Sequence, residues 1–399
     1  MNYDFTPEQL EIQRFVRELA QKEWGPAAEK WESDGYIPDA VLQQIAELGF
    51  MGLVVPEEYG GNAYDTISMI LTIEEIAKVS ASLAIAVSVH NSVGAWPILA
   101  FGTEGQKKNY LPRMAKGMLG AFSLSEPDAG SDAAGLRATA VRDGDGYVLN
   151  GAKNWVTNGA HAGIYTVYAS TDRAKGSKGL TAFVIERGTP GLVLGNREDK
   201  MGLKASDTLS ITLEDCRVPA ENRLGEEGHG FKIAMQALDG GRIGVAAQAL
   251  GVAEAAFEHA VRYSKVRKAF GKSLCELQPV QWMIADMARR VEAARMLTYR
   301  AAWLRSEGLP CTREAAMAKL HASETATFVT HRAIQVHGGY GYVRDYKVER
   351  FYRDARVMEI YEGASEIQRL VIARSVLKEG VAPLLGCVLP LRWPAQGRP

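Results

Sequence analysis

The arrangement of hydrophobic and polar positions predicts helices in the first third of the chain. Apolar residues between Ile12 and Leu19 recur at the spacing of one buried helix face. The segment Thr6–Gln9 before them offers an N-cap threonine, a first-turn proline and a glutamine three residues after the cap. A second helix is predicted from Asp39 to Leu48, ended by Gly49, and the helical pattern resumes at Thr66.

Short strands separated by turn residues replace this pattern from about Gly120. Ala138–Arg142 and Tyr147–Asn150, on either side of Asp143–Gly146, predict a hairpin. Further β-rich runs occupy Tyr165–Ser170, Leu180–Glu186 and Leu209–Leu213. This sequence of short strands and turns predicts a compact antiparallel barrel or sandwich that ends near Pro219–Gly230.

Helical periodicity returns after Gly230 and continues to about Lys378, in segments long enough for a bundle. The predicted fold class is therefore α+β and multidomain. The predicted domains are an N-terminal α-helical domain at 1–119, a middle antiparallel β-barrel or sandwich at 120–228, a C-terminal helical bundle at 229–380 and a proline-containing tail at 381–399.

One apolar stretch, Leu83–Phe101, has the length of a membrane span. Polar residues and a proline interrupt it, so a buried helix followed by a break is the better prediction. A helix is predicted almost from the first residue, which leaves no room for a signal or transit peptide. We therefore expect a soluble, cytoplasmic protein.

The charge balance disfavours two classes of partner. The 399 residues include 46 Lys and Arg against 47 Asp and Glu, so no overall field attracts nucleic acid or an anionic membrane. The four cysteines are Cys216, Cys275, Cys311 and Cys387. Their wide spacing predicts reduced thiols, and the seven histidines show no metal-ligand spacing.

Common catalytic signatures are missing from the sequence. No G-x-G-x-x-G follows a predicted strand, and no serine has glycine two residues away on both sides. If the chain does chemistry, a bound organic cofactor is the expected source of it.

Four segments stand out by composition, and each has a structural and a functional interpretation: Phe122–Asp132, Asn154–Gly159, Gln335–Tyr342 and Tyr361–Gln368. The first is either a helix-to-strand connection or a loop whose N–H groups meet a ligand. The second holds a tryptophan that either packs in the core or covers a flat ring. The third is either a C-cap and turn or a place where a pyrophosphate approaches the backbone.

The fourth segment carries the candidate acid–base residue. Ser365 and Gln368 have the spacing of a capping box that opens the last helix, which places Glu362 in the turn before it. A loop glutamate of this kind is more often a solvated charge than a catalyst.

Taken together and in this order, the four segments resemble the acyl-CoA dehydrogenase family, in particular its short-chain (butyryl-CoA) members. Further matching stretches are Asp239–Gly244, Arg267–Lys272 with Gln278, and Tyr352–Arg356. The resemblance covers about residues 1–378. It implies a C-terminal four-helix bundle, a homotetramer, and FAD bound between the β domain and the bundle with a neighbouring subunit completing the site.

The resemblance also assigns residues to ligands. Those expected to line the flavin are Phe122, Leu124, Ser125, Gly130, Ser131, Trp155, Val156, Thr157, Ala364, Ser365 and Glu366. Those expected to hold the ADP half of FAD across a subunit interface are Arg267, Phe270, Gln278, Gln335, Val336, His337, Gly338 and Gly339. Those that match acyl-CoA contacts are Ser131, Asp239, Gly240, Gly241, Arg242 and Gly363. Ala364 replaces a frequent threonine, so only a backbone contact is expected there.

The implied reaction is α,β-dehydrogenation of a short-chain acyl-CoA to trans-2-enoyl-CoA, a step of fatty acid β-oxidation. Glu362 would take the α-proton while the β-hydride goes to the flavin, and electrons would pass to an electron-transfer flavoprotein. Some branches of the family place the base at the position of Gly241, which cannot act. Branched-short-chain or medium-chain activity, an acyl-CoA oxidase and a catalytically silent homologue remain alternatives.

Overall fold

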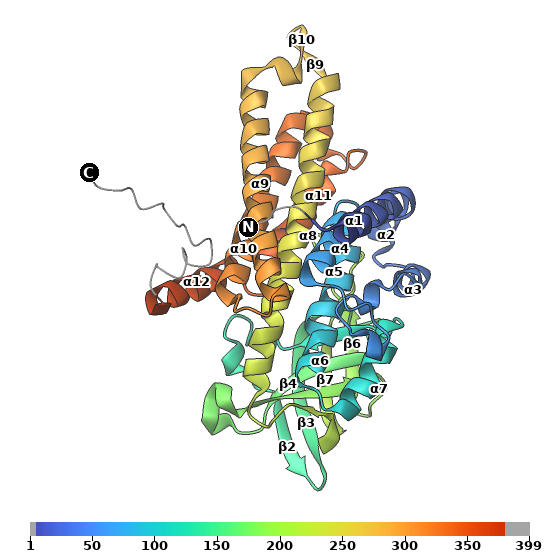
Figure 1. The fold of residues 1–399 in the computed structure, drawn as a ribbon, viewed down its shortest axis with the longest axis vertical. Helices are drawn as coiled ribbons and strands as arrows, with labels where there is room; N and C mark the ends of the chain where they lie inside the picture. The colour runs from blue at the N-terminus through green and yellow to red at the C-terminus, as the bar shows by residue number, and fades with distance from the viewer. Residues whose placement is uncertain (1–4, 380–399) are drawn as a thin grey trace, which may run out of the picture.

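A computed structural model describes residues 5–379 of the chain (Figure 1). It has a helical N-terminal domain, a middle β-sheet domain and a helical C-terminal domain, which confirms the predicted fold class. The predicted tail at 381–399, and Cys387 within it, lie outside the described residues. Cys216, Cys275 and Cys311 are free thiols.

The N-terminal domain consists of short helices, three of which begin at the predicted positions Pro7, Asp39 and Thr66. Its α-helices are α1 (Pro7–Leu19), α2 (Gly25–Asp34), α3 (Asp39–Glu47), α4 (Thr66–Ala77), α5 (Ala81–Val89), α6 (Trp96–Phe101) and α7 (Glu104–Ala115). Both hydrogen bonds of the predicted capping box between Thr6 and Gln9 are present. Gly49 follows the end of α3 with φ of +80°, a conformation that glycine adopts without a steric penalty.

The apolar stretch differs from its prediction because the chain does not break at the polar residues. Instead α5 runs through a π-helical segment, η4 (His90–Ala95), into α6, whose first turn accommodates Pro97. The polar side chains are buried and bonded to backbone: His90 to Met51 O at 2.7 Å, and Asn91 to Phe50 O at 2.9 Å. Helix Ala81–Phe101 is long and apolar enough to span a membrane, but 83% of its most apolar window is buried inside the protein.

The middle domain is built around one sheet with the order β6-β7-β3-β2-β4-β5-β8, and β1 pairs with β4. The strands are β1 (Gly120–Ser123), β2 (Thr139–Asp143), β3 (Gly146–Thr157), β4 (Ile164–Ser170), β5 (Leu180–Glu186), β6 (Leu192–Arg197), β7 (Thr208–Pro219) and β8 (Arg223–Leu224). Most pairs are antiparallel, as predicted. The sheet is nevertheless mixed, because β1 pairs with β4 in parallel and β2 meets β4 in parallel at one residue pair.

The C-terminal domain is organised by three long helices, α8 (Gly230–Val266), α9 (Gln278–Ser306) and α10 (Thr312–His337). The shorter helices α11 (Val348–Arg356) and α12 (Ser365–Glu379) contact α10. A small two-stranded ribbon of β9 (Lys268–Ala269) and β10 (Lys272–Ser273) caps the turn between α8 and α9. Figure 1 shows this turn at the opposite end of the molecule from the sheet.

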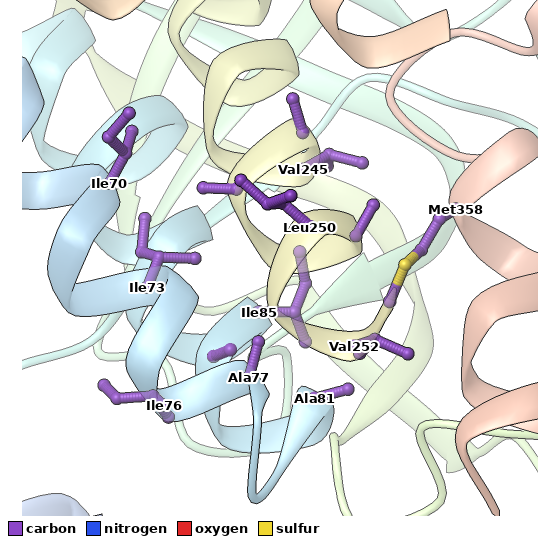
Figure 2. Packing of buried hydrophobic residues seen from close by; sticks show 14 of the residues in the cluster. Ile70, Ile73, Ile76, Ala77, Ala81, Ile85, Val245, Leu250, Val252 and Met358 are labelled. Atoms are coloured by element: carbon purple, nitrogen blue, oxygen red, sulfur yellow. The ribbon is translucent and has the colours of Figure 1, made fainter. Parts of the chain in front are cut away.

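One hydrophobic core joins the N-terminal and C-terminal domains. Figure 2 shows Ile73 and Ile85, from α4 and α5, packed beside Leu250 of α8, with Met358 on another side of that helix. All four side chains are at most 1% exposed. This core fixes α8 against α5 and η4, and the candidate site lies along that contact.

Candidate active site

Glu362 lies in a tight turn between the 3-10 helix η10 (Val357–Glu359) and α12. Its φ is +50° and that of Gly363 is +94°, so two successive residues are left-handed. For a glutamate this conformation costs roughly 1–3 kcal/mol, and it persists only where surrounding contacts hold it. The Gln368 amide supplies two such contacts, donating to Gly363 O at 2.8 Å and to Glu362 O at 3.3 Å.

The carboxylate of Glu362 packs directly against α8 at Gly241. A Cβ atom at Gly241 would lie 1.8 Å from Glu362 Oε2 and 3.1 Å from Val93 Cγ1, so no larger residue fits there. The Oε2 atom is buried and has no hydrogen-bond partner among the described residues. Burial raises the pKa of Glu362 to about 7, while the nearby cations Lys319 and Arg242 oppose that shift.

The two cations differ in how they are bonded. Arg242 Nη1 donates to Asp239 Oδ1 at 2.8 Å, and the second oxygen of that carboxylate accepts the Thr312 hydroxyl at 2.5 Å. Lys319, fully buried on α10, donates to Gly363 O at 2.7 Å. The structure therefore brings Glu362 and Gly363 together with Gly241 and Arg242, all predicted as site residues, and adds Lys319.

A β-bulge presents Trp155 to solvent at the sheet end of the site. The register of β3 against β7 shifts between Lys153 and Val156, and Trp155 has φ of +62°. Bulges of this kind re-aim a side chain out of the sheet. The indole is 60% exposed, whereas Val156 is fully buried. Trp155 is therefore not the core tryptophan of the structural interpretation.

The loop after β1 is fastened beside Trp155 by a buried ion pair. Lys153 Nζ donates to Glu126 Oε1 at 2.7 Å and to Leu124 O at 3.2 Å. The N–H of Asn154 donates to Ser125 O at 2.9 Å. The first and second segments of the sequence analysis therefore lie side by side.

The remaining predicted residues of these two segments differ in exposure. Leu124 is buried, Gly130 and Ser131 are exposed, and Phe122, Ser125 and Thr157 are intermediate. The Phe122 ring packs on Tyr168 with centroids 5.1 Å apart. Only the partly or fully exposed members have side-chain surface free for a ligand in this chain.

The third segment lies in a separate cavity of about 1000 Å³, far from Glu362. Its lining includes Arg267 and the segment Gln335–Tyr340, and Arg267 lies over the Tyr340 ring at 5.4 Å. Phe270, 92% exposed, and Gln278 are not among the lining residues. Along α8 the distance from Gly241 to Arg267 is roughly 40 Å, so one cofactor molecule cannot touch both in the same chain.

In the part of the segment that lines this cavity, the glycine backbone is more exposed to a ligand than the side chains of the preceding residues. Gly338 has φ of +61° and caps α10, and Gly338 and Gly339 are exposed. By contrast Val336 and His337 are each 4% exposed, and the His337 ring stacks on Tyr263 with centroids 4.2 Å apart. A ligand in this cavity would therefore be contacted largely by the glycine backbone, Gln335 and Arg267.

The capping box predicted for α12 is wrong. The helix begins at Ser365, so Ser365 is its first residue and not its cap, and its buried hydroxyl has no partner among the described residues. The Gln368 amide reaches back to the carbonyls of Glu362 and Gly363 instead. Ala364, which has no side-chain acceptor, precedes the helix, and Glu366 is exposed.

A second cavity, of about 450 Å³, lies where α8 begins. It is lined by Ser177, Lys178, Glu227, Gly228, His229, Phe231 and Lys232. Sequence reasoning missed it, because its two lysines come from segments about 50 residues apart that carry no motif. A helix N-terminus and lysines together favour an anionic ligand.

Sequence reasoning also missed Lys319, although a signal was present. Ala315, Ala316 and Ala322 lie three or four residues from it, on a buried face of α10. A lysine among such residues breaks the apolar face and indicates a specific partner.

The fold has three domains, and the Glu362 carboxylate is enclosed between α8 and α12. Family models for acyl-CoA dehydrogenase match in three consecutive parts: the N-terminal domain at 6–118, the middle domain at 121–216 and the C-terminal domain at 228–377. The chain belongs to the acyl-CoA dehydrogenase family. The resemblance inferred from the sequence is confirmed.

Individual relatives are similar over nearly the whole chain. Acryloyl-CoA reductase (NADH) of Anaerotignum propionicum is 47% identical, over 95% of this chain and 96% of its own length. The structure of butyryl-CoA dehydrogenase from Megasphaera elsdenii is 46% identical, with a TM-score of 0.93, covering 94% of this chain and 100% of that one. A chain from a structure of the electron transferring flavoprotein of Acidaminococcus fermentans is 48% identical, with a TM-score of 0.93, covering 95% and 100%.

The residues present fit a flavin. The exposed indole of Trp155 is a large apolar surface next to the loop that carries Ser125. The buried Glu362 oxygen has no partner among the described residues, so it is available to a ligand that can donate to it.

Proposed function

We propose that the protein is an FAD-dependent short-chain acyl-CoA dehydrogenase that forms trans-2-enoyl-CoA and passes electrons to an electron-transfer flavoprotein. The observation that carries the proposal is the Glu362 carboxylate, enclosed against Gly241 with one oxygen left without a partner. A pKa raised to about 7 by burial makes it a stronger base than a solvated glutamate.

Each part of the site has a proposed task. FAD, when bound, would supply the acceptor for the electron pair. Trp155, Ser125 and Thr157 would hold its ring system, and Glu362 would accept the substrate's α-proton at its carboxylate. A backbone N–H in the turn at Glu362 would stabilise enolate character at the thioester oxygen, a contribution of about 3 kcal/mol per well-placed donor.

The CoA part of the substrate is proposed to follow α8 toward its N-terminus. Asp239 and Phe231 precede Gly241 on that helix, and Phe231 lies about 15 Å away at 1.5 Å per residue. Phe231 lines the 450 Å³ cavity together with Lys178 and Lys232, whose ammonium groups suit the nucleotide phosphates.

The acyl part is proposed to point the other way along α8, into a closed space. Gln248, two helical turns after Gly241, is fully buried. Its amide donates to Ala81 O at 2.8 Å, and its oxygen accepts the Tyr361 hydroxyl. This pair closes the space about 10 Å from Gly241, which favours a short acyl chain.

A neighbouring subunit is proposed to complete each FAD site, giving a homotetramer as in the family. The support is the roughly 40 Å along α8 between Gly241 and Arg267. The 1000 Å³ cavity around Arg267 and Gly338 would receive the ADP half of the cofactor that another chain holds by its flavin end.

The test is reduction of the bound flavin by substrate under anaerobic conditions. Butyryl-CoA should bleach the visible flavin band of the parent protein, with slower bleaching by octanoyl-CoA. The Glu362→Gln variant should keep FAD and lose bleaching by at least 1000-fold, since it has no proton acceptor. Glu58→Gln, at an exposed glutamate far from Glu362 in the sequence, serves as the control. Full reduction of the Glu362→Gln variant would refute the assignment.

The relative that reduces acryloyl-CoA with NADH favours one second candidate, the same chemistry run in reverse. The direction of electron flow distinguishes the dehydrogenase from the reductase. A dehydrogenase should transfer electrons from butyryl-CoA to a purified electron-transfer flavoprotein. A reductase should instead consume NADH and acryloyl-CoA together when that flavoprotein is present.

A further inference from the structure

The turn that carries Glu362 depends on a buried lysine from another helix. Lys319 comes from the middle of α10, is fully buried, and donates from Nζ to Gly363 O at 2.7 Å. Gly363 directly follows Glu362, and both residues have positive φ. A side chain that binds this carbonyl therefore restricts the backbone conformation that aims the Glu362 carboxylate.

Few other charges face Glu362. From α8 it faces Arg242, which is already bonded to Asp239. Val93 of η4, which packs at Gly241 beside the carboxylate, is apolar. The segment of Glu362 itself contributes Tyr361, whose hydroxyl is bonded to Gln248, and the acids Glu359 and Glu366, which act on Lys319.

Lys319 also has an electrostatic effect on the carboxylate. Burial lowers the pKa of Lys319 to about 8, and the carboxylates of Glu362, Glu359 and Glu366 oppose that decrease while Arg242 adds to it. Lys319 in turn acts on Glu362: of the two cations that lower the pKa of Glu362 against the effect of burial, Lys319 has the larger influence. The ammonium thus acts on the base without forming a bond to it.

We propose that Lys319 is a positioning residue for the base: its ammonium group holds the Gly363 carbonyl and favours the ionised form of the adjacent Glu362 carboxylate. The inference rests on the proposed function, in which Glu362 accepts the α-proton. It assigns two tasks to one side chain, and different substitutions separate them.

Three variants distinguish the donor from the charge. Lys319→Met removes both, Lys319→Gln retains a hydrogen-bond donor without charge, and Lys319→Arg retains the charge. Lys108→Met, at an exposed lysine on α7, controls for the loss of one positive charge. All proteins are used full-length and loaded with FAD.

The measurement is the rate of flavin bleaching by butyryl-CoA in stopped flow from pH 5.5 to 9.5. In the parent and in Lys108→Met, the rate should rise with pH through a midpoint near 7, as Glu362 loses its proton. In Lys319→Gln and Lys319→Met the midpoint should move up by about one pH unit, so the rate at pH 7 falls about fivefold and the loss approaches about tenfold at lower pH. At alkaline pH the rate of Lys319→Gln should recover, whereas Lys319→Met, which also lacks the donor, should stay slower. Lys319→Arg should keep the parent midpoint.

FAD content and thermal unfolding are recorded for every variant, so that a folding defect is recognised. If Lys319→Met does not fold, Lys319→Gln carries the test. A flavin-loaded Lys319→Gln with the parent midpoint overturns the inference, and so does a rate loss that is equal at all pH values. If butyryl-CoA fails to bleach the flavin of the parent protein, the proposed function itself fails. If the parent reacts but the variants share its pH midpoint, only the inference about Lys319 fails.

Discussion

Two buried lysines in this protein stabilise their surroundings in different ways. Lys153, in the sheet, bonds Glu126 directly, and the Glu126 carboxylate also accepts the N–H groups of Arg137 and Ala138 at 2.5 and 2.9 Å. Lys319, in the bundle, bonds the carbonyl next to an acid, and one oxygen of that acid, Glu362, has no partner among the described residues.

The difference separates a structural ion pair from a carboxylate that is left able to react. At Glu126 both carboxylate oxygens accept hydrogen bonds from the protein, one of them from the Lys153 ammonium. At Glu362 the nearby cations Lys319 and Arg242 offset the negative charge without a direct bond, and the Oε2 atom has no hydrogen-bond partner among the described residues. A buried carboxylate of the second kind is less stable and is prepared to accept a proton from a ligand.

The largest expected effect comes from breaking the structural pair. Lys153→Met leaves the Glu126 carboxylate buried without its cation and should cost about 3–5 kcal/mol of unfolding free energy. Because Leu124 O loses a donor as well, the loop beside Trp155 should loosen and FAD affinity should fall. Urea unfolding and the release of flavin fluorescence on dilution measure the two effects.

Lys175→Met is the matched control for this substitution. Lys175 also pairs with a carboxylate, that of Asp172 at 3.0 Å, but the lysine side chain is 67% exposed. Its loss should cost less than about 1 kcal/mol. Equal costs for the two variants would contradict the view that the Lys153 pair is structurally important.

A smaller effect with a definite pH dependence is expected at Glu362. Its pKa in the folded protein, about 7, lies above the ordinary value of 4.5, so the folded state disfavours ionisation. The resulting cost is absent below pH 4.5, grows as the pH rises toward 7, and is complete above it. Glu362→Gln removes the ionisation and should stabilise the protein by roughly 2–3 kcal/mol more at pH 8 than at pH 5.

The measurement compares urea unfolding of parent and Glu362→Gln proteins at the two pH values. Glu58→Gln, at an exposed site, should show no such pH dependence. A Glu362→Gln variant whose stability relative to the parent is the same at both pH values would mean that Glu362 ionises freely, and the contrast with Glu126 would be lost.

The fold was largely predictable because its signals are local. The Thr6–Gln9 capping box, the Gly49 stop after α3 and the hairpin around Gly144 each depend on residues within a few positions of one another. The helical character of Leu83–Phe101 was predicted, but its continuity was not. That continuity depends on Met51 and Phe50 accepting hydrogen bonds from residues about 40 positions away.

The candidate-site residues that belong to a motif could be predicted from the sequence, whereas those that reach the site only through packing could not. Glu362, Gly241 and Arg242 were identified by resemblance, and the structure places them together. The capping box at Ser365 failed because the same Ser-x-x-Gln pattern also fits a helix that begins one residue earlier. Lys319 and Gln248 have no motif, since their partners, Gly363 O and Tyr361, are 44 and 113 residues away.

The smallest expected effect concerns the satisfied pair beside the base, Gln248 and Tyr361. Unlike Glu362, Gln248 is bonded at both ends of its amide, so it should act as a fixed wall of the acyl space. Gln248→Ala opens room for about two methylene groups, each worth about 0.8 kcal/mol when buried. The ratio of hexanoyl-CoA to butyryl-CoA in kcat/KM should therefore rise about tenfold.

Tyr361→Phe distinguishes the effect of side-chain volume at Gln248 from the effect of its hydrogen bond. It removes the bond to Gln248 but adds no space, so the preference between the two chain lengths should stay within about twofold of the parent, although stability should fall by about 1 kcal/mol. Steady-state assays with both substrates on the FAD-loaded proteins decide the matter. If Tyr361→Phe shifts the preference as strongly as Gln248→Ala, hydrogen bonding and not volume sets the chain length, because only the bond is common to the two variants.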